Sequence, residues 1–324
     1  MLLQEVLVMT RYRDVIWMGM LVILVGLLGN LVPIGAAAAD WTAMESGAKN
    51  TLYAVWGSSG KDVFAVGAAG TILHYDGSAW KAMDSGVKGI LLGVWGTSDK
   101  DVFAMGEDGV ILHYDGSKWT AVTSGTEYPL IKMWGVGSDI FAVGDWGAIV
   151  HYDGSKWTAM KGFWDHPLYG VWASSGSDVF AVGKNGAIEH YDGKEWTSMV
   201  GGLNQFGGTG NQMNGVWGTS ANEVYAADVY GTVLHYDGKT TWRVLTGKVI
   251  KGGGGTINQI NGVGWIAGND MFGVGQKGTI FHHDGSAWKA MDSGVKNHLF
   301  GVWGSSSNDV FAVGDQGVIL HYAK

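Results

Sequence analysis

The sequence has no cysteine, little proline and little arginine, and these absences limit the kinds of structure and function that the chain can have. The chain of 324 residues contains no cysteine, which excludes disulfides, a lipid-modified cysteine and cysteine-ligated metals, so the fold depends on its core alone. Proline occurs only 3 times, and arginine only as Arg11, Arg13 and Arg243. With a formal net charge of -8, the chain lacks the basic stripe that binding to nucleic acid requires.

The N-terminal segment has the layout of a secretory signal peptide. Arg11 and Arg13 precede an apolar stretch over residues 15–28, and alanines at 37–39 stand before Asp40. A charged patch, an apolar stretch and small residues before a cleavage point are the three parts of such a signal. The sequence therefore predicts that residues 1–39 are removed and that the remainder is exported to the periplasm or the cell exterior.

Two points in this segment stay open. Translation that starts at Met9 instead of Met1 would leave the signal complete. Residues 15–34 are also about long enough to span a bilayer, so an uncleaved membrane anchor is the alternative to cleavage. Either alternative exports residues 40–324 and allows membrane contact only through a retained N-terminal segment.

One short motif, LHYDG, recurs with small variations along the rest of the chain, at intervals of about forty residues. Glycines divide the first copy into four apolar segments that predict strands, at 52–57, 63–67, 71–75 and 80–83. No stretch after residue 40 has helical periodicity. The seven histidines of the motif are His74, His113, His151, His190, His235, His282 and His321.

Seven units of about forty residues and four strands each predict an all-β fold, a seven-bladed β-propeller. Apolar and polar residues alternate little along these strands, because neighbouring blades cover both faces of each sheet. Lys132 interrupts a series of small residues in the third blade. This series lies in the predicted first strands, where blades crowd toward the axis, and comprises Ala54, Gly93, Gly170, Gly215, Gly262 and Gly301.

The two ends of the repeat region complete one another. The last copy stops at VILHYAK without a fourth strand, while residue 40 begins DWTAMESG, which matches AWKAMDSG at 79–86. We therefore predict that the N-terminal strand completes the C-terminal blade and closes a monomeric ring, since an open solenoid would need polar caps instead. Closure makes Trp41 the seventh member of a fourth-strand series that otherwise comprises Trp80, Trp119, Trp157, Trp196, Trp242 and Trp288.

The repeat W-G-S/T-S-x-x-D-V-F-A-V-G-x-x-G-x-I-L-H-Y-D-G-x-x-W resembles that of bacterial exported propellers over residues 40–324. It is more distantly similar to Asp-box propellers and to the photosystem II assembly-factor type. In Asp-box families the hairpin is structural and lies between the third and fourth strands, where Asp76 and Trp80 fall here. Most copies here have D-G-x-x-W, one residue shorter than the family's S-x-D-x-G-x-x-W. The resemblance implies the fold and leaves the function open.

The repeated polar and aromatic residues are interpreted as structural. Equivalent histidines lie too far apart around a ring to share a metal ion, which needs three or four converging ligands, and no metal or other cofactor is predicted. Each histidine is expected to pack beside a tryptophan of its own blade and to bond a turn carboxylate or a backbone carbonyl. Each DVF aspartate is expected to accept backbone N–H groups in its turn. Residues given this structural role include Trp41, Trp56, His74, Asp76, Trp80, His113, Asp115 and Trp119.

Ligand binding is expected in the loops that depart from the repeat. Propeller geometry places loops from strand four to the next strand one beside loops between strands two and three, on what we call the upper face. Three unusual loops of the first kind span 161–170, 201–214 and 247–261. Aromatic, amide and carboxylate groups suit sugar stacking and protein anchoring equally, and the rings could also merely cover the face. The candidate ligand residues are Asp145, Trp146, Trp164, Phe206, Asn211, Asp228 and Tyr230.

Two functions remain. The first is an exported, non-enzymatic binding or scaffold propeller whose upper face takes a protein or glycan partner at the cell envelope. The second is a carbohydrate-active hydrolase or lyase that uses paired carboxylates. A sialidase is excluded because Arg243, the single arginine after residue 40, cannot form the arginine cluster of those enzymes. The carboxylates available to a hydrolase are Glu107, Asp108, Asp145, Asp228 and Asp315.

Overall fold

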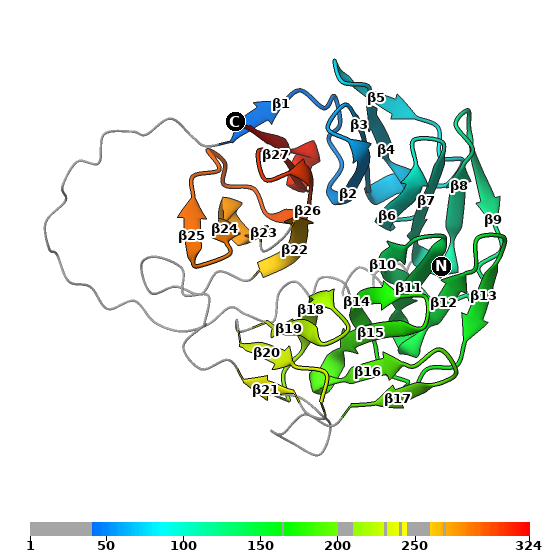
Figure 1. Cartoon of the computed structure of the whole chain (residues 1–324). Coiled ribbons are helices and arrows are strands. Elements are labelled where there is room, and N and C mark those ends of the chain that lie inside the picture. Colours follow the sequence, from blue (N-terminus) through cyan, green and yellow to red (C-terminus); the bar gives the residue numbers. More distant parts are fainter. Residues whose placement is uncertain are drawn as a thin grey trace, which may run out of the picture. The chain divides into compact units, whose positions relative to one another are not determined.

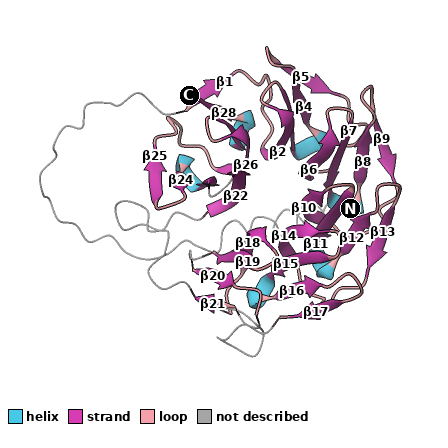
Figure 2. Cartoon of the chain, viewed as in Figure 1, coloured by secondary structure: helices cyan, strands magenta, loops and turns pink. Residues whose placement is uncertain are grey.

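The chain forms a seven-bladed β-propeller of four-stranded antiparallel sheets (Figures 1 and 2). The predicted all-β fold is therefore confirmed. In the part of the chain that is described, no helix is long and apolar enough to cross a membrane. The computed structural model describes residues 41–163, 165–199, 210–229, 232–239, 242–244, 260–267 and 270–324.

The strands take the same four places in every blade. The first strands are β2 (Leu52–Ser59), β6 (Leu91–Ser98), β10 (Leu130–Val136), β14 (Leu168–Ser175), β18 (Met213–Ser220), β22 (Ile260–Ala267) and β26 (Leu299–Ser306). The second strands are β3 (Asp62–Gly67), β7 (Asp101–Gly106), β11 (Asp139–Gly144), β15 (Asp178–Gly183), β19 (Glu223–Asp228), β23 (Asp270–Gly275) and β27 (Asp309–Gly314). We number the blades one to seven in this order.

The outer strands complete the sheets. The third strands are β4 (Ile72–Tyr75), β8 (Ile111–Tyr114), β12 (Ile149–Tyr152), β16 (Ile188–Tyr191), β20 (Val233–Tyr236), β24 (Ile280–Asp284) and β28 (Ile319–Ala323). The fourth strands are β5 (Trp80–Met83), β9 (Trp119–Val122), β13 (Trp157–Met160), β17 (Trp196–Ser198), β21 (Arg243–Val244), β25 (Trp288–Met291) and, in blade seven, β1 (Thr42–Met44).

Within the described ranges, short 3-10 turns join second to third strands in six blades. Each holds its central residue at a positive φ, which glycine adopts without strain but which is uncommon for other residues. The glycine that follows also has a positive φ, 65° at Gly70. The turns are η1 (Ala68–Gly70), η2 (Glu107–Gly109), η3 (Asp145–Gly147), η4 (Lys184–Gly186), η5 (Gln276–Gly278) and η6 (Asp315–Gly317).

The predicted closure of the ring is confirmed. Strand β1 pairs antiparallel with β28, with Thr42 opposite His321 and Met44 opposite Ile319. Beside this strand, the indole of Trp41 is buried and meets the ring of Phe272 edge-on, at 5.9 Å between centroids. Residues from the two ends of the propeller sequence therefore share one sheet (Figure 1).

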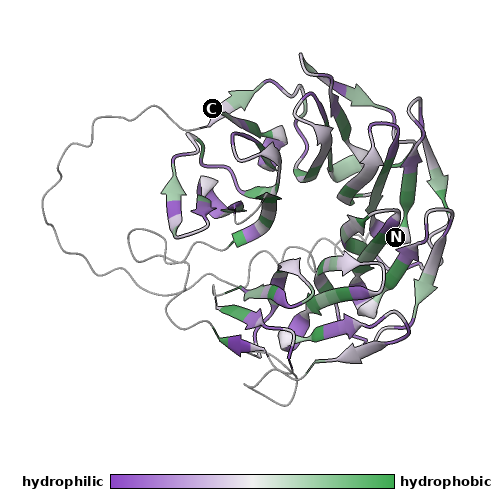
Figure 3. Cartoon of the chain, viewed as in Figure 1, coloured by the Kyte–Doolittle hydropathy of each residue, from purple (hydrophilic) through white to green (hydrophobic). Residues whose placement is uncertain are grey.

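The core lies between blades, because the second strands of six blades carry a phenylalanine that reaches the next blade. Phe64 of blade one contacts Trp119 of blade two edge-on at 6.0 Å, and Phe180 of blade four contacts Trp242 of blade five in the same way. Figure 3 shows apolar segments on strands throughout the ring. Coverage on both faces explains why these strands lack a polar side.

Blades five and six depart from this pattern. Tyr225 takes the place of the phenylalanine in blade five, and His283 takes that of the tyrosine before the fourth strand in blade six. Gly264 stands where blade one has Trp56. Among the described residues, no aromatic pair joins blades five and six, while at least one joins each other pair of neighbours.

Candidate binding face

Backbone hydrogen bonds bring the two kinds of loop together, as expected for an upper face. In η1, η2, η3, η4 and η6, the first residue of the turn donates its N–H to the carbonyl of the residue before the first strand of its own blade, as Asp145 does to Pro129 at 2.9 Å. Lys184 makes the same bond to Pro167, and Asp315 to His298. The upper face is thus a rigid extension of the blades.

Three large hydrophobic side chains stand exposed on this face, over blades three and four. Tyr128 is 50% exposed, Trp146 54% and Phe163 53%. The rings of Tyr128 and Trp146 lie 6.4 Å apart between centroids, at 34° to one another. Exposed aromatic rings of this kind are characteristic anchors of protein interfaces. We call Tyr128, Trp146 and Phe163 the aromatic patch.

Trp146 is presented by an unusual backbone. It occupies the central position of η3 with φ of 56°, where other blades have small or polar residues such as Ala69, Asn185 and Gln316. A bulky side chain at positive φ is strained. Since the same φ recurs in the other five turns, the fold sets this backbone, and in η3 it presents a large ring.

A buried carboxylate holds the loop that carries Phe163. Glu189 in β16 is 0% exposed, and its Oε2 accepts the backbone N–H of Phe163 at 2.9 Å. The equivalent third-strand position holds Leu73 in blade one and Val150 in blade three. Sequence reasoning missed Glu189, although a charged residue in an otherwise apolar position was the available signal.

Asp228 and Asn211 stabilise a loop instead of facing solvent. Asp228 replaces the glycine that ends other second strands, and its side chain is buried. Its carboxylate accepts the Asn211 side-chain amide and the Thr232 backbone N–H, both at 2.8 Å. Two of the predicted ligand residues are therefore brought together, in a structural role.

Other acidic residues lie close to the first strands. The Ile90 backbone N–H donates to Glu107 Oε2 at 2.9 Å, and the Thr51 hydroxyl to Asp315 Oδ1 at 3.2 Å. Burial, together with the nearby Asp145 carboxylate, raises the pKa of Tyr169 to about 12. Three of the acids proposed for a hydrolase thus bind loops of different blades, namely Glu107, Asp228 and Asp315.

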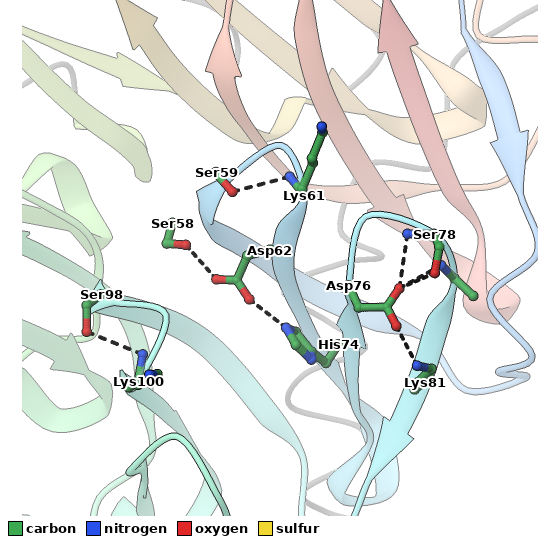
Figure 4. Close-up of polar contacts among 11 residues, drawn as sticks. Ser58, Ser59, Lys61, Asp62, His74, Asp76, Ser78, Lys81, Ser98 and Lys100 are labelled. Carbon is green, nitrogen blue, oxygen red and sulfur yellow. Dashed lines mark hydrogen bonds and ion pairs between the residues drawn. The ribbon is translucent and has the colours of Figure 1, made fainter.

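At the other end of the blades, the repeated histidines bind the DVF aspartates. His74 Nε2 lies 2.6 Å from Asp62 Oδ1, and Ser58 donates its hydroxyl to Asp62 Oδ2 at the same distance (Figure 4). The aspartate was expected to accept backbone N–H groups of its turn, but it serves a histidine and a hydroxyl instead. Equivalent pairs occur in all seven blades, with Glu223 in place of aspartate in blade five.

The expected packing of these histidines was wrong. His74 stacks on Phe64 of its own blade at 4.4 Å, while Trp80 packs against Tyr75 and against Phe311 of the preceding blade. The histidine lies over the phenylalanine because both face the same way on paired strands, with Phe64 directly opposite His74.

Asp76 and Asp115 have the hairpin role that was predicted. Asp76 Oδ1 accepts the backbone N–H groups of Ser78 and Ala79, each at 3.0 Å, and Lys81 bonds its other oxygen (Figure 4). Hydrogen bonds from Ser117, followed by the backbone of Lys118, lower the pKa of Asp115 to about 2. These turns fix the start of each fourth strand.

Not every predicted site residue can be placed. Trp164, Phe206 and Tyr230 lie outside the described residues, as does the segment 1–39. Within the described ranges, no group of three histidines or acidic residues is arranged to hold a metal ion. Tyr128 and Phe163 were missed because their exposure depends on how each loop leaves its blade.

No protein-family model matches the sequence, and no curated protein is similar to it. Solved structures share the fold. YCF48 bound to a D1 peptide gives a TM-score of 0.68 at 16% identity, covering 88% of this chain and 95% of that one. YCF48 from Cyanidioschyzon merolae gives 0.67 at 16% identity, covering 88% and 99%. The WD40 propeller domain of Doa1 gives 0.69 at 12% identity, covering 87% and 96%.

At these identities the similarity shows the fold alone. It supports the expected resemblance to photosystem II assembly-factor propellers at the level of architecture. Membership of the bacterial exported family with this repeat stays a prediction.

Proposed function

We propose that this protein is an exported, non-enzymatic binding propeller whose upper face, over blades three and four, takes a protein partner. The observation that carries the proposal is the aromatic patch, Tyr128, Trp146 and Phe163, exposed on a rigid frame. Aromatic residues in such a setting supply most of the binding free energy of many interfaces. A neighbour of the same fold, YCF48, is seen bound to a peptide, which supports a protein partner.

Site-specific photo-crosslinking tests this proposal. A photoreactive amino acid replaces Trp146 or Phe163 in the producing cell, and Lys100, in the loop between first and second strands, provides a control on the opposite face. We expect discrete protein adducts at positions 146 and 163 and none at 100. Adducts confined to position 100, or none at either upper position, would contradict a protein partner on this face.

A glycan partner and an enzymatic role are tested separately. Glycan-array binding that is lost in Trp146→Ala would replace the protein partner with a lectin-like function. Turnover of a polysaccharide that is lost in Asp145→Asn or Asp228→Asn would establish the alternative hydrolase or lyase. We do not expect turnover, because Asp228 is buried and already accepts two hydrogen bonds.

A further inference from the structure

A lysine stands where the other six blades have glycine or alanine. Lys132 in β10 lies opposite Val143, the register that Gly170 takes opposite Val182 and Gly301 opposite Val313. Consecutive first strands contact one another here, nearest the centre of the ring (Figure 1). Position 132 therefore belongs to the inner wall of the propeller.

First strands lie close together at several positions of this wall. A Cβ atom at Gly262 would lie 2.3 Å from the carbonyl oxygen of Phe300, and one at Gly170, in the blade after blade three, would lie 3.3 Å from Gly215 Cα. A lysine chain is too long to fit between strands this close. We infer that Lys132 runs along their inner edge toward the axis, where its side chain stays only partly buried.

Lys132 has no anionic partner in the part of the chain that is described, although the sequence carries 29 acidic residues. Burial alone lowers its pKa, without a contribution from any charged neighbour. An unpaired cation is costly to remove from water. Packing does not require the lysine, since the other blades do without a long side chain here.

We propose that Lys132 anchors an anion-binding site at the axis of the propeller, and that the group it takes is a single carboxylate. The carboxylate would supply the missing counter-charge through a charge-assisted hydrogen bond.

Titration of isotope-labelled lysine by NMR tests the site in the purified protein. Lys132→Ala assigns the Lys132 signal, and we expect it to keep the fold because blade one has alanine at this position. We expect acetate, but not its neutral analogue acetamide, to shift this signal in a saturable way. Acetate should also raise the titration midpoint of Lys132, because a bound anion stabilises the ammonium form.

Thermal melts give an independent readout. Acetate should raise the melting temperature of the wild type and of Lys184→Ala, a matched variant in η4, but not that of Lys132→Ala. Affinity for acetate should fall about tenfold or more without the Lys132 ammonium group. A Lys132 signal that does not shift when acetate is added would overturn the proposal. So would an increase in melting temperature with acetate that persists in Lys132→Ala.

The source of the carboxylate is resolved in the same titration. A short peptide with one glutamate, compared with its glutamine counterpart, should bind more tightly than acetate if the natural ligand is a polypeptide, and no more tightly if it is a small molecule. The proposal does not rest on the proposed function, because it depends on Lys132 and not on a residue of the aromatic patch. Crosslinking at position 146 and the Lys132 titration can therefore fail separately.

Discussion

Glu189 is a single residue whose replacement should change a loop without changing the blade. Glu189→Leu restores the residue of blade one and removes the acceptor of the Phe163 N–H. An amide that loses its buried partner opens more readily. We expect hydrogen exchange at Phe163 to become at least about tenfold faster, as measured by NMR or mass spectrometry.

Glu189→Gln provides the control for this substitution. Its side-chain carbonyl still accepts the hydrogen bond, so exchange at Phe163 should stay close to that of the wild type. Equal protection of Phe163 in Glu189→Leu and Glu189→Gln would show that the carboxylate does not hold the loop.

The hairpin aspartates make stability depend on acid pH. Hydrogen bonds from Ser117 and Ser155 are the main causes that lower the pKa values of Asp115 and Asp153 to about 2. These values lie below the unfolded-state value of about 3.9, so the unfolded chain takes up protons first as the pH falls. The stabilisation is complete above about pH 5 and is lost toward about pH 2.

Circular dichroism melts across this interval check the expectation. The melting temperature should hold steady above about pH 5 and then fall, and the fall should be smaller in the double variant Ser117→Ala, Ser155→Ala. A melting temperature that is constant down to about pH 2 would show that these turns do not couple to folding.

At the scale of the element, β1 is a short strand on which the thermal stability of the ring should depend strongly. Deleting residues 40–47 removes the partner of β28 and the buried Trp41, and leaves an unpaired edge in blade seven. We expect a melting temperature lower by many degrees, or aggregation. Trp41→Ala keeps strand β1 and removes only the indole, and should lower the free energy of unfolding by about 3–5 kcal/mol through lost packing. An unchanged melting curve after the deletion would mean that closure does not stabilise the ring.

Elements were predictable from the sequence where one physical cause decided them. Glycine-bounded apolar segments gave the strands of blade one, and the DWTAMESG match gave β1, because both depend on burial against neighbouring blades. The partner of His74 depended on which side chains of paired strands share a face, and a list of residues does not contain that register. The exposure of Tyr128 and Phe163 depended on loop paths that only the folded blades determine.

At the scale of the whole molecule, the seam between blades five and six should be the weakest. Restoring the repeat with Tyr225→Phe and His283→Tyr would recreate the interblade aromatic contact seen between Phe64 and Tyr114. Such a pair contributes about 0.5–1.5 kcal/mol beyond burial. The melting temperature should then rise by roughly 1–5 °C in scanning calorimetry.

The reverse exchange is the matched control. Phe64→Tyr with Tyr114→His transfers the blade-five and blade-six residues to the seam between blades one and two, and should lower the melting temperature by a similar amount. Native-state hydrogen exchange should also find β19 and β24 among the first strands to open. A stability unaffected by both exchanges would show that these contacts do not set the strength of the seams.

Ring closure also determines when a newly made chain can finish folding. The Ser46 hydroxyl donates to the Gly317 carbonyl across 271 residues of sequence, beside the pairing of β1 with β28. The first strand of the propeller to be synthesised must therefore wait for the last, and until then blade seven has an open edge. A second copy carries an identical β1 that fits this edge equally well. A high concentration of chains during folding thus favours pairs of rings linked by exchanged N-terminal strands. A low concentration favours the self-closed monomer.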